Sequence, residues 1–278
     1  MKRILVPCDF SAPSLEAFKF AVNIASRTGG EVTVLHVVPI PILYDPILAG
    51  ASAIDPVVFS EIEKDAKGRF EKMKADLPSG KAKASMQIIQ GTVISATKRL
   101  IETQKIDLVI MGTTGTSGLQ EIFIGSTTEK VVRHSPVPVL AIRTAPDIES
   151  IKKILLPTKL GLDQAEFVSK VKELQHFFNA TLHILLINTL QNFRSDVEAK
   201  ASLTKFADYY NLKNYSLHFK NYNNAEEGII NFARDEQIGL VAMATHSWKG
   251  FVHFIAGSIT EDVVNHIQFP VWAYSLNE

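Results

Sequence analysis

The chain has 278 residues, of which 46% are hydrophobic and 21% are charged, a composition typical of globular proteins. Its 29 basic and 29 acidic residues cancel, which excludes the strongly basic character of proteins that bind nucleic acid or anionic membranes. The single cysteine, Cys8, excludes an internal disulfide. No apolar run is long enough for a membrane helix, and the N-terminal residues lack the pattern of a signal peptide. We therefore expect a cytoplasmic protein.

Strands and amphipathic helices alternate along the first half of the sequence. Residues 3–6 are apolar on both faces, as in the middle of a parallel sheet, and a helix follows from Ser11, with Pro13 in its first turn and Gly29 at its end. Further strands are predicted at residues 31–38, 85–90, 107–111 and 137–142, and further helices at 64–75, 93–104 and 126–134. This alternation predicts an α/β, doubly wound fold with a five-stranded parallel sheet. Ligands of such folds bind at the carboxyl ends of the strands, where the winding reverses.

The pattern of the first half begins again after residue 150. Residues 152–157 repeat residues 2–7 at an offset of 150, with four of six positions identical. Residues 243–264 repeat residues 111–132 at an offset of 132, with nine of 22 positions identical. We therefore predict two tandem domains, 1–146 and 151–278, with a linker around residues 144–150.

The two offsets differ by 18 residues, which places extra length in the first half. We assign it to residues 39–59, which are too broken by proline and aspartate for a long helix and unusually apolar for a loop. Two interpretations stay open. The segment either packs on the surface of its own domain, or it forms a lid or a contact surface between chains. A monomer is the simplest expectation, and a homodimer would use this segment.

A glycine-rich stretch occupies residues 112–126, between a buried strand and a predicted helix. Ser126 and Glu129 have the spacing of a capping box, which marks the start of that helix. Glycine lets a ligand approach the backbone closely, and the free amide groups at a helix start attract anions. The sequence therefore predicts that a nucleotide or another phosphate compound binds here.

The spacing of Gly112, Gly115, Gly125 and Ser126 resembles the G-2x-G-9x-G-(S/T) signature of the universal stress protein family. Residues 2–11 are similar to the first strand of that family with its acidic adenine contact, and residues 135–140 to its last strand. The resemblance implies an adenine nucleotide alpha hydrolase-like fold and binding of ATP, ADP or AMP. It also implies that the two domains pair through their final strands, here residues 137–142 and 271–274, as a pseudo-dimer within one chain.

The resemblance also implies a set of ligand contacts. Asp9 would bind the adenine edge and Val37 the ring, although Asp9 could instead only cap the following helix. The other residues of the set lie along the glycine-rich stretch, mostly beside the ribose and the phosphates: Met111, Gly112, Thr113, Gly115, Gly125, Ser126 and Thr127. Ser126 could serve the capping box alone, or both roles together. Whether Mg²⁺ accompanies the phosphates stays open.

The second half departs from this signature. Lys159 stands in place of Asp9 and Ala244 in place of Gly112, while residues 257–258 are again Gly-Ser. A lysine cannot accept the adenine amino proton, and a side chain at residue 244 narrows the approach to a phosphate. We expect a partner domain whose site is lost or altered, with a remaining anion site as the alternative.

Three functions stay open from the sequence. The first is a nucleotide-binding stress-response module that regulates through conformation or assembly, with little or no hydrolysis. The second is an enzyme, either a slow ATPase or one that uses an adenylate, although the sequence lacks a P-loop and we assign no catalytic residue. The third is a scaffold that binds no nucleotide. No spacing of Cys and His indicates a metal site.

Overall fold

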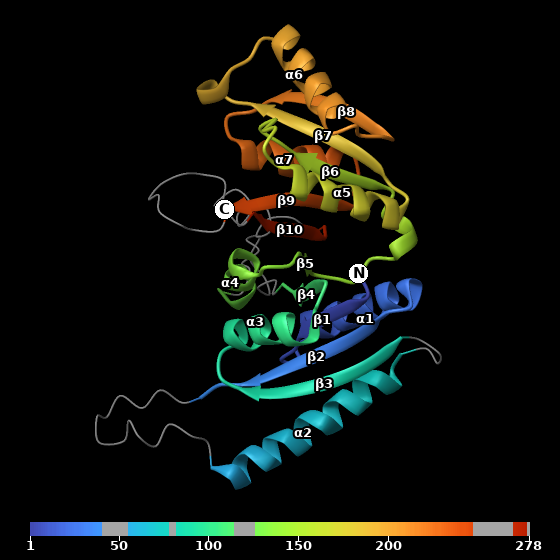
Figure 1. Ribbon diagram of the computed structural model, residues 1–278, viewed down its shortest axis with the longest axis vertical. Coiled ribbons are helices and arrows are strands. Elements are labelled where there is room, and N and C mark those ends of the chain that lie inside the picture. Colours follow the sequence, from blue (N-terminus) through green and yellow to red (C-terminus); the bar gives the residue numbers. More distant parts are fainter. Residues whose placement is uncertain (41–54, 78–81, 114–125, 247–268, 277–278) are drawn as a thin grey trace, which may run out of the picture.

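A computed structural model describes residues 1–40, 55–77, 82–113, 126–246 and 269–276, in which helices and strands alternate through both halves (Figure 1). The elements of the first half are β1 (Arg3–Pro7), α1 (Ala12–Thr28), β2 (Glu31–Val38), α2 (Pro56–Ala75), β3 (Lys83–Gln90), α3 (Val93–Gln104), β4 (Leu108–Gly112), α4 (Ser126–His134) and β5 (Val139–Ile142). A 3₁₀ turn, η1 (Ile148–Ser150), leads to the second half, which consists of β6 (Lys153–Pro157), α5 (Ala165–Phe178), β7 (Thr181–Asn188), η2 (Leu190–Asn192), α6 (Asp196–Tyr209), β8 (Tyr215–Asn221), α7 (Ala225–Asp235), β9 (Leu240–His246) and β10 (Val271–Leu276).

The strands form one continuous sheet in the order β3-β2-β1-β4-β5-β10-β9-β6-β7-β8. Neighbouring strands are parallel within each half, and β5 and β10 are antiparallel where the halves meet, with Val271 opposite Ala141 and Ala273 opposite Val139. This arrangement confirms the predicted α/β fold with two doubly wound parallel sheets that pair through their final strands. Pairing β5 with β10 leaves neither strand as an open sheet edge.

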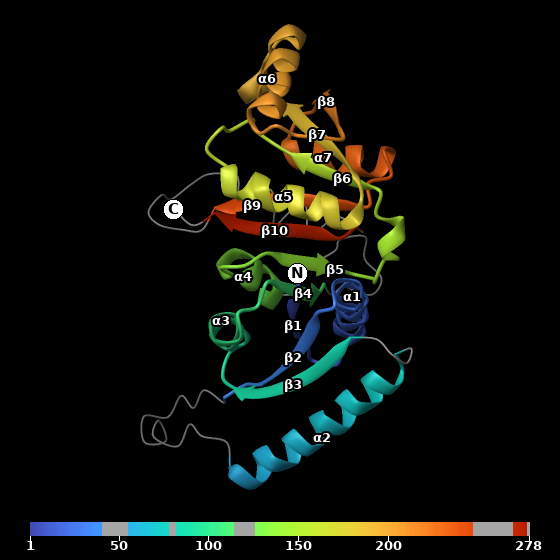
Figure 2. The ribbon, with the colours of Figure 1, turned by 45° about the vertical axis from the view of Figure 1, so that its right-hand side comes forward.

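Helices cover both faces of the sheet (Figure 2). On one face α1, α2, α5 and α6 share a single apolar cluster, which includes the buried rings of Phe18, Phe70, Phe178 and Phe206. On the other face α3 and α4 pack on the first half and α7 packs on the second. The apolar face of each helix therefore lies against the sheet, and burial of one such side chain contributes about 1.5–3 kcal/mol. Among the described helices, none is long and apolar enough to cross a membrane.

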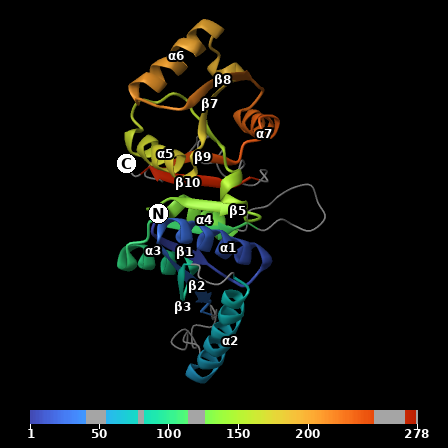
Figure 3. The ribbon, with the colours of Figure 1, turned by 90° about the vertical axis from the view of Figure 1, so that its right-hand side faces the viewer.

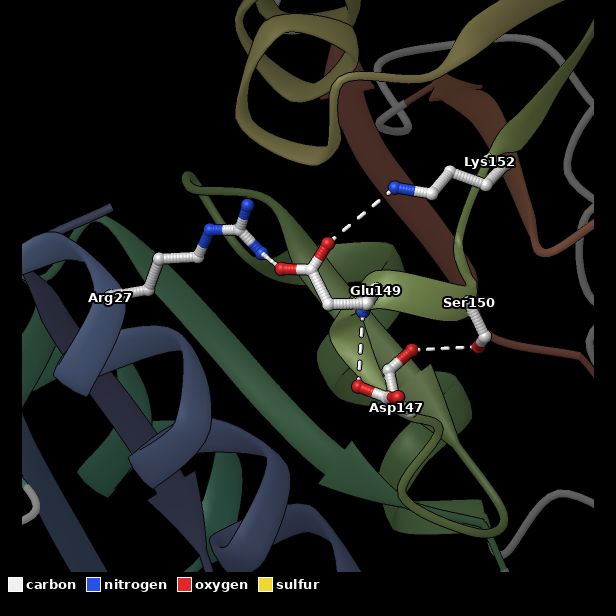
Figure 4. A network of polar contacts seen from close by, with 5 residues as sticks. All are labelled: Arg27, Asp147, Glu149, Ser150 and Lys152. Atoms are coloured by element: carbon white, nitrogen blue, oxygen red, sulfur yellow. Dashed lines mark hydrogen bonds and ion pairs between the residues drawn. The ribbon is translucent and has the colours of Figure 1, made fainter.

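The segment between the two halves is fixed to the rest of the protein (Figure 4). Glu149 pairs with Arg27 of α1 at 2.5 Å and with Lys152 at 3.5 Å. Asp147 caps η1 by accepting a hydrogen bond from the Glu149 N–H at 3.1 Å. The Arg27 guanidinium also lies 5.7 Å from the ring centroid of Phe177 on α5, so this side chain of the first half contacts both the connecting segment and the second half. The predicted linker is thus a short structured connection.

The predicted helix at residues 64–75 begins earlier, at Pro56, so residues 56–59 of the segment that we expected to be irregular are helical. That part of the expectation is wrong because Asp55 and Pro56 start a helix. The Asp55 carboxylate accepts a hydrogen bond from the Val57 N–H at 2.7 Å, and proline is favoured in the first helical turn. Residues 41–54, which hold most of the proposed lid or contact segment, lie outside the described residues.

Candidate functional site

The winding of the first half reverses between β1 and β4. From β1 the chain proceeds through β2 to β3 on one side, then continues with β4 and β5 on the other side. Asp9 follows β1 by two residues, and Gly112 is the last residue of β4. Both predicted ligand residues therefore lie at the carboxyl ends of adjacent strands, the position at which such folds bind their ligands.

Asp9 fixes the turn that leads from β1 into α1. Its Oδ1 accepts hydrogen bonds from the Ser11 hydroxyl at 2.6 Å and from the Ser11 N–H at 3.0 Å. Burial tends to raise the pKa of Asp9, but the hydrogen bonds from Ser11 outweigh it and keep the pKa below its ordinary value. The side chain is consequently an exposed carboxylate at neutral pH, with both of these bonds on a single oxygen. Ser11, not Asp9, is the N-cap residue of α1.

The same turn holds Phe10 in a left-handed conformation, with φ at 63°. Its N–H donates to Cys8 Sγ at 3.4 Å, and its ring lies 5.0 Å from that of His36 and 4.5 Å from the Arg69 guanidinium of α2. The Nδ1 of His36 lies 2.9 Å from the Cys8 carbonyl oxygen, so this histidine supports the turn. Burial raises the pKa of the Cys8 thiol, which therefore stays protonated and does not provide a nucleophile.

Val37 and Met111 belong to one apolar cluster on the face covered by α3 and α4. Val37 is half-buried near the end of β2, and Met111 is buried near the end of β4. Ile89, near the end of β3, and Val93, the first residue of α3, pack against the same cluster. The structure thus brings the predicted ring contact, Val37, and Met111 together as an apolar wall at the carboxyl ends of β2 and β4.

Gly112 is tightly packed against the start of α1. A Cβ atom at this position would lie 2.3 Å from the carbonyl carbon of Pro13 and 2.7 Å from the backbone nitrogen of Ser14. No L side chain fits at such distances without movement of backbone, so helix packing alone requires glycine here. The first glycine of the signature therefore has a structural role, whatever it contributes to a ligand.

Thr113 differs from its predicted role. Its N–H donates to the Ile142 carbonyl oxygen at 2.8 Å, and its hydroxyl lies 3.3 Å from the same oxygen. The side chain is buried. The amide that the resemblance assigned to ribose or phosphate is therefore already engaged at the end of the sheet, because β4 and β5 remain paired up to this point.

The two ends of the glycine-rich stretch lie close together. It leaves β4 at Thr113 and returns at Ser126, the first residue of α4, and the Thr128 hydroxyl donates to the Gly112 carbonyl oxygen at 3.3 Å. Thr127 is exposed at the start of α4. Gly115, Gly125 and the side chain of Ser126 lie outside the described part of the structure, as does the capping box. The loop therefore closes at the point where the winding reverses, and the start of α4 lies beside it.

The second half repeats the backbone of this site. Leu160 has the same left-handed conformation as Phe10, with φ at 67°, and its N–H donates to the Thr158 hydroxyl at 2.9 Å. Thr245 is buried like Thr113, with its hydroxyl 3.5 Å from the carbonyl oxygen of Tyr274 in the last strand. The duplication is therefore visible in hydrogen bonds as well as in sequence.

The residues at the matching ligand positions differ. Lys159 replaces Asp9, and Ala244 replaces Gly112. At the repeat offset of 150, the first residue of α5, Ala165, corresponds to Leu15, so α5 begins three residues later than α1 and has 14 residues where α1 has 17. The helical turn that would block a Cβ at residue 244 is thus absent.

The universal stress protein family matches the sequence twice, at residues 1–143 and 150–275. The chain belongs to the universal stress protein family. Its two halves both match that family, and the candidate site described above lies in the first of them.

Other members resemble this universal stress protein over one half or over its whole length. Universal stress protein MJ0531 of Methanocaldococcus jannaschii is 31% identical over 142 residues, which cover 51% of this chain and 82% of that protein. Universal stress protein Slr1230 of Synechocystis sp. is 24% identical over 292 residues, with 99% of this chain and 100% of that protein covered. The crystal structure of a universal stress protein from Archaeoglobus fulgidus superposes with a TM-score of 0.73 at 18% identity over 98% of both chains, which supports the fold.

A histidine pair in the second half of this universal stress protein was not predicted. The rings of His183 on β7 and His218 on β8 are parallel within 1° and their centroids lie 5.0 Å apart. His183 is buried, and its Nδ1 has no hydrogen-bond partner among the described residues. Burial lowers the pKa of both imidazoles, so both are neutral at pH 7. The sequence does contain a signal for this pair. At the repeat offset of 150, His183 corresponds to Thr33, so the histidine distinguishes the second half from the first.

Thr128 and Arg69 were also missed as parts of the site. Thr128 joins α4 to the end of β4, and its recurrence as Thr260 at the repeat offset of 132 could have indicated a role. Arg69 reaches Phe10 from a helix that is distant in sequence, and no local pattern predicts that contact. In the described part of this universal stress protein, no group of three or more His, Cys, Asp or Glu side chains is arranged to hold a metal ion.

Proposed function

We propose that this universal stress protein binds one adenine nucleotide per chain in its first half and acts as a stress-response regulatory module with little or no hydrolysis. The observation that carries the proposal is that an exposed carboxylate, Asp9, follows β1 while the start of α4 is bonded to the end of the adjacent strand β4, where the winding reverses. A carboxylate accepts hydrogen bonds from the amino group of adenine, and the amide groups at a helix start favour phosphate. Residues 1–146 would then be the nucleotide-binding domain and residues 151–278 its partner domain.

The residues at this place suit the two ends of a nucleotide. Ser11 engages one oxygen of Asp9, and the second oxygen would accept the adenine amino group. Val37 and Met111 would contact the ring from the apolar wall. The phosphates would lie against the glycine-rich stretch and the first turn of α4, with Gly115, Gly125, Ser126 and Thr127 as the proposed contacts and Mg²⁺ as an accompanying ion.

The described side chains give less support to an enzyme. The Cys8 thiol stays protonated because it is buried, and Nδ1 of His36 is engaged by the Cys8 carbonyl oxygen. The Asp9 carboxylate is acidic and already hydrogen-bonded, so it is a poor general base at neutral pH. Slow hydrolysis, or use of an adenylate, therefore remains the second candidate, and a scaffold without nucleotide the third.

Titration calorimetry with ATP, ADP and AMP, with and without Mg²⁺, distinguishes these candidates. We expect one nucleotide per chain and no phosphate release above the uncatalysed rate during the titration. Absence of heat with all three nucleotides would favour the scaffold, whereas steady phosphate release would favour the enzyme. Cell fractionation tests the cytoplasmic location that we also propose.

Asp9→Asn tests the adenine contact without removing the turn. Asparagine keeps an oxygen for Ser11 but presents an NH₂ group to the adenine amino group, so a charge-assisted hydrogen bond is replaced by two opposed donors. We expect ATP affinity to fall about 10- to 100-fold. Inosine triphosphate has an acceptor oxygen in place of the adenine amino group. Asp9→Asn should therefore lower the affinity for inosine triphosphate much less than the affinity for ATP.

Lys159→Asn is the matched control, because it changes the equivalent turn of the second half and should leave ATP affinity unchanged. Equal effects of the two variants would contradict the assignment of the site to the first half. An Asp9→Asn variant that binds ATP as well as the wild-type protein would place the nucleotide elsewhere.

A further inference from the structure

The second half exposes a group of large apolar side chains at one end of the molecule. Leu190 is 89% exposed, Phe193 75%, Val197 80% and Tyr209 60%, and all four belong to η2, to α6 or to the residues between them. They are four of the seven exposed large apolar side chains in the described part of the chain. Figures 1 and 3 show α6 at one end of the long axis, far from α2 at the other end. We call the surface of residues 190–209 the α6 surface.

The exposure of these side chains is fixed by the structure around them. Asn188 is buried, and its side chain accepts a hydrogen bond from the Arg194 N–H at 2.8 Å and donates to the Arg194 carbonyl oxygen at 3.2 Å. Ser195 and Glu198 then form a complete capping box at the start of α6. The turn that carries Leu190 and Phe193 is therefore held on both sides, and the apolar groups are presented to solvent by a well-bonded backbone.

The two faces of α6 differ. Ala199, Leu203 and Phe206 are buried against the sheet, whereas the opposite face forms a shallow hollow. This hollow is lined by Val197, Lys200, Ala201, Thr204, Lys205, Asp208 and Tyr209. The residues Val197, Ala201, Thr204 and Asp208 follow one another at helical spacing, and the two in the middle are small enough for a second helix to approach closely.

Two opposite charges of this face lie at equal distances on either side of Thr204, and a third charge, Lys205, lies next to it. Lys200 precedes Thr204 by four residues and Asp208 follows it by four, so each lies about 6 Å along the helix axis from that point. Within the described part of the chain, neither Lys200 nor Asp208 has an ion-pair partner. An antiparallel helix with the same sequence would therefore place an aspartate opposite each lysine.

We propose that the α6 surface pairs with the α6 surface of a second copy of this chain, antiparallel and about a two-fold axis near Thr204. Lys200 of each copy then faces Asp208 of the other, so one contact occurs twice, as in an isologous interface. Tyr209 of the second copy then lies opposite residue 199, about 3 Å along the helix axis from Val197, so that its ring covers this apolar side chain. Antiparallel helix dipoles also oppose each other favourably.

A charge reversal tests the pairing. Sedimentation velocity of the full chain over a range of concentrations should show a monomer–dimer equilibrium. Lys200→Asp and Asp208→Lys should each weaken dimerisation at least about tenfold, because each places like charges together twice. The double variant Lys200→Asp/Asp208→Lys should recover the affinity of the wild-type protein. Recovery in the double variant excludes misfolding as the cause of the single effects.

A cysteine crosslink tests the geometry of the interface. Thr204→Cys should form a disulfide-linked dimer on mild oxidation, because the two-fold axis brings residue 204 of both copies together. The wild-type protein, whose only cysteine is the buried Cys8, should not crosslink, and Glu61→Cys on α2 should not either. Val57→Glu, at the opposite end of the molecule, should leave dimerisation unchanged.

Several outcomes would overturn the proposal. A protein that stays monomeric up to about 100 µM has no such interface of measurable strength. A dimer that is insensitive to Lys200→Asp but weakened by Val57→Glu would use the region around α2 instead. Failure of the double charge reversal to restore dimerisation would exclude the antiparallel arrangement.

Discussion

The two halves of the sheet present the same backbone at the carboxyl ends of their strands but offer different chemistry there. Phe10 and Leu160 occupy equivalent left-handed turns, and the hydroxyl groups of Thr113 and Thr245 lie toward equivalent carbonyl groups of the last strand of each half, those of Ile142 and Tyr274. The exposed group is a carboxylate in the first half, at Asp9, and an ammonium in the second. Duplication has thus kept the frame of the site, while the side chains that a ligand would meet have changed.

The glycine at the end of β4 shows why the signature alone cannot be interpreted as binding. Gly112 has no room for a Cβ because the first turn of α1 lies against it. In the second half that turn is missing from α5, and Ala244 occupies the position. The change from glycine to alanine therefore accompanies a shortened helix, and it follows from packing whether or not a ligand was ever bound there.

The largest effect is expected where the halves meet. Leu140 and Trp272 are equivalent residues that face each other across the antiparallel pair, and the Trp272 ring stacks on Phe167 with centroids 6.1 Å apart. Trp272→Ala should lower the free energy of unfolding by about 4 kcal/mol, and Leu140→Ala by about 3 kcal/mol, because each leaves a cavity at the junction. Urea unfolding measures both. A loss below about 1 kcal/mol for either variant would mean that the junction is not tightly packed.

A smaller effect is expected when glycine and alanine are exchanged at the equivalent positions 112 and 244 of β4 and β9. Gly112→Ala should lower the free energy of unfolding by about 2 kcal/mol, since the new Cβ overlaps the backbone of Pro13. Ala244→Gly should cost only about 1 kcal/mol, through the flexibility that glycine gives the unfolded chain. Urea unfolding of the two variants side by side checks the asymmetry.

Gly68→Ala in α2 is the control for this exchange. No atom lies within 4 Å of the added Cβ, so the variant should gain about 0.5–1 kcal/mol from helix propensity. Should Gly112→Ala be as well tolerated as Gly68→Ala, the close contact between α1 and β4 would be refuted.

The shared frame predicts equal effects at the two threonines. Thr113→Val and Thr245→Val each remove a hydroxyl that is placed toward the carbonyl oxygen of Ile142 or Tyr274, while the shape of the side chain is kept. Each should lower the free energy of unfolding by about 1 kcal/mol. Thermal or urea unfolding of both variants checks this. A clear effect in one half alone would show that the frame is not equivalent after all.

The smallest effect at neutral pH is expected for the histidine pair, which distinguishes the second half. Because burial lowers the folded-state pKa of His183, the unfolded chain binds a proton more readily than the folded one. Above pH 6.5, the ordinary pKa of histidine, the imidazole is neutral in both the folded and the unfolded state. The free energy of unfolding falls as the pH drops below that value. Lys153 and Lys220 near the pair add to this loss, whereas Glu236 reduces it.

His183→Thr introduces the residue of the first half and should remove much of this acid sensitivity. We expect the wild-type protein and the variant to differ in the pH dependence of the urea midpoint between pH 7 and about 5, with a flatter profile for the variant. His218 corresponds to Gln87 of β3, because they pair with the equivalent residues Leu185 and Leu35. His218→Gln should therefore also flatten the pH profile. Parallel profiles for all three proteins would exclude the pair as the source of acid sensitivity.

Much of the fold follows from patterns in the sequence. The predicted bounds of α3 and α4 agree with the structure, because a capping residue and an apolar period mark both helices clearly. The pairing of β5 with β10 was implied by the resemblance to the family together with the duplication. The start of α2 was missed because aspartate and proline were interpreted as a break, although this order also begins a helix.

The candidate site was predictable in its location but less so in its atoms. The sequence places Asp9 and Gly112 at strand ends, and the order of strands brings them together. It does not show that the Thr113 N–H is engaged by Ile142, or that Pro13 lies against Gly112, because both depend on distances between elements far apart in the chain. The charge reversal from Asp9 to Lys159, by contrast, can be seen in the sequence alone.

The antiparallel joint between β5 and β10 has a consequence for access to the protein. Since the strands of one half run against those of the other at that joint, their carboxyl ends open toward opposite margins of the same sheet. A molecule held at the first margin leaves the second margin unobstructed. The residues at the strand ends of one half can therefore change by mutation without steric interference from a ligand at the strand ends of the other half.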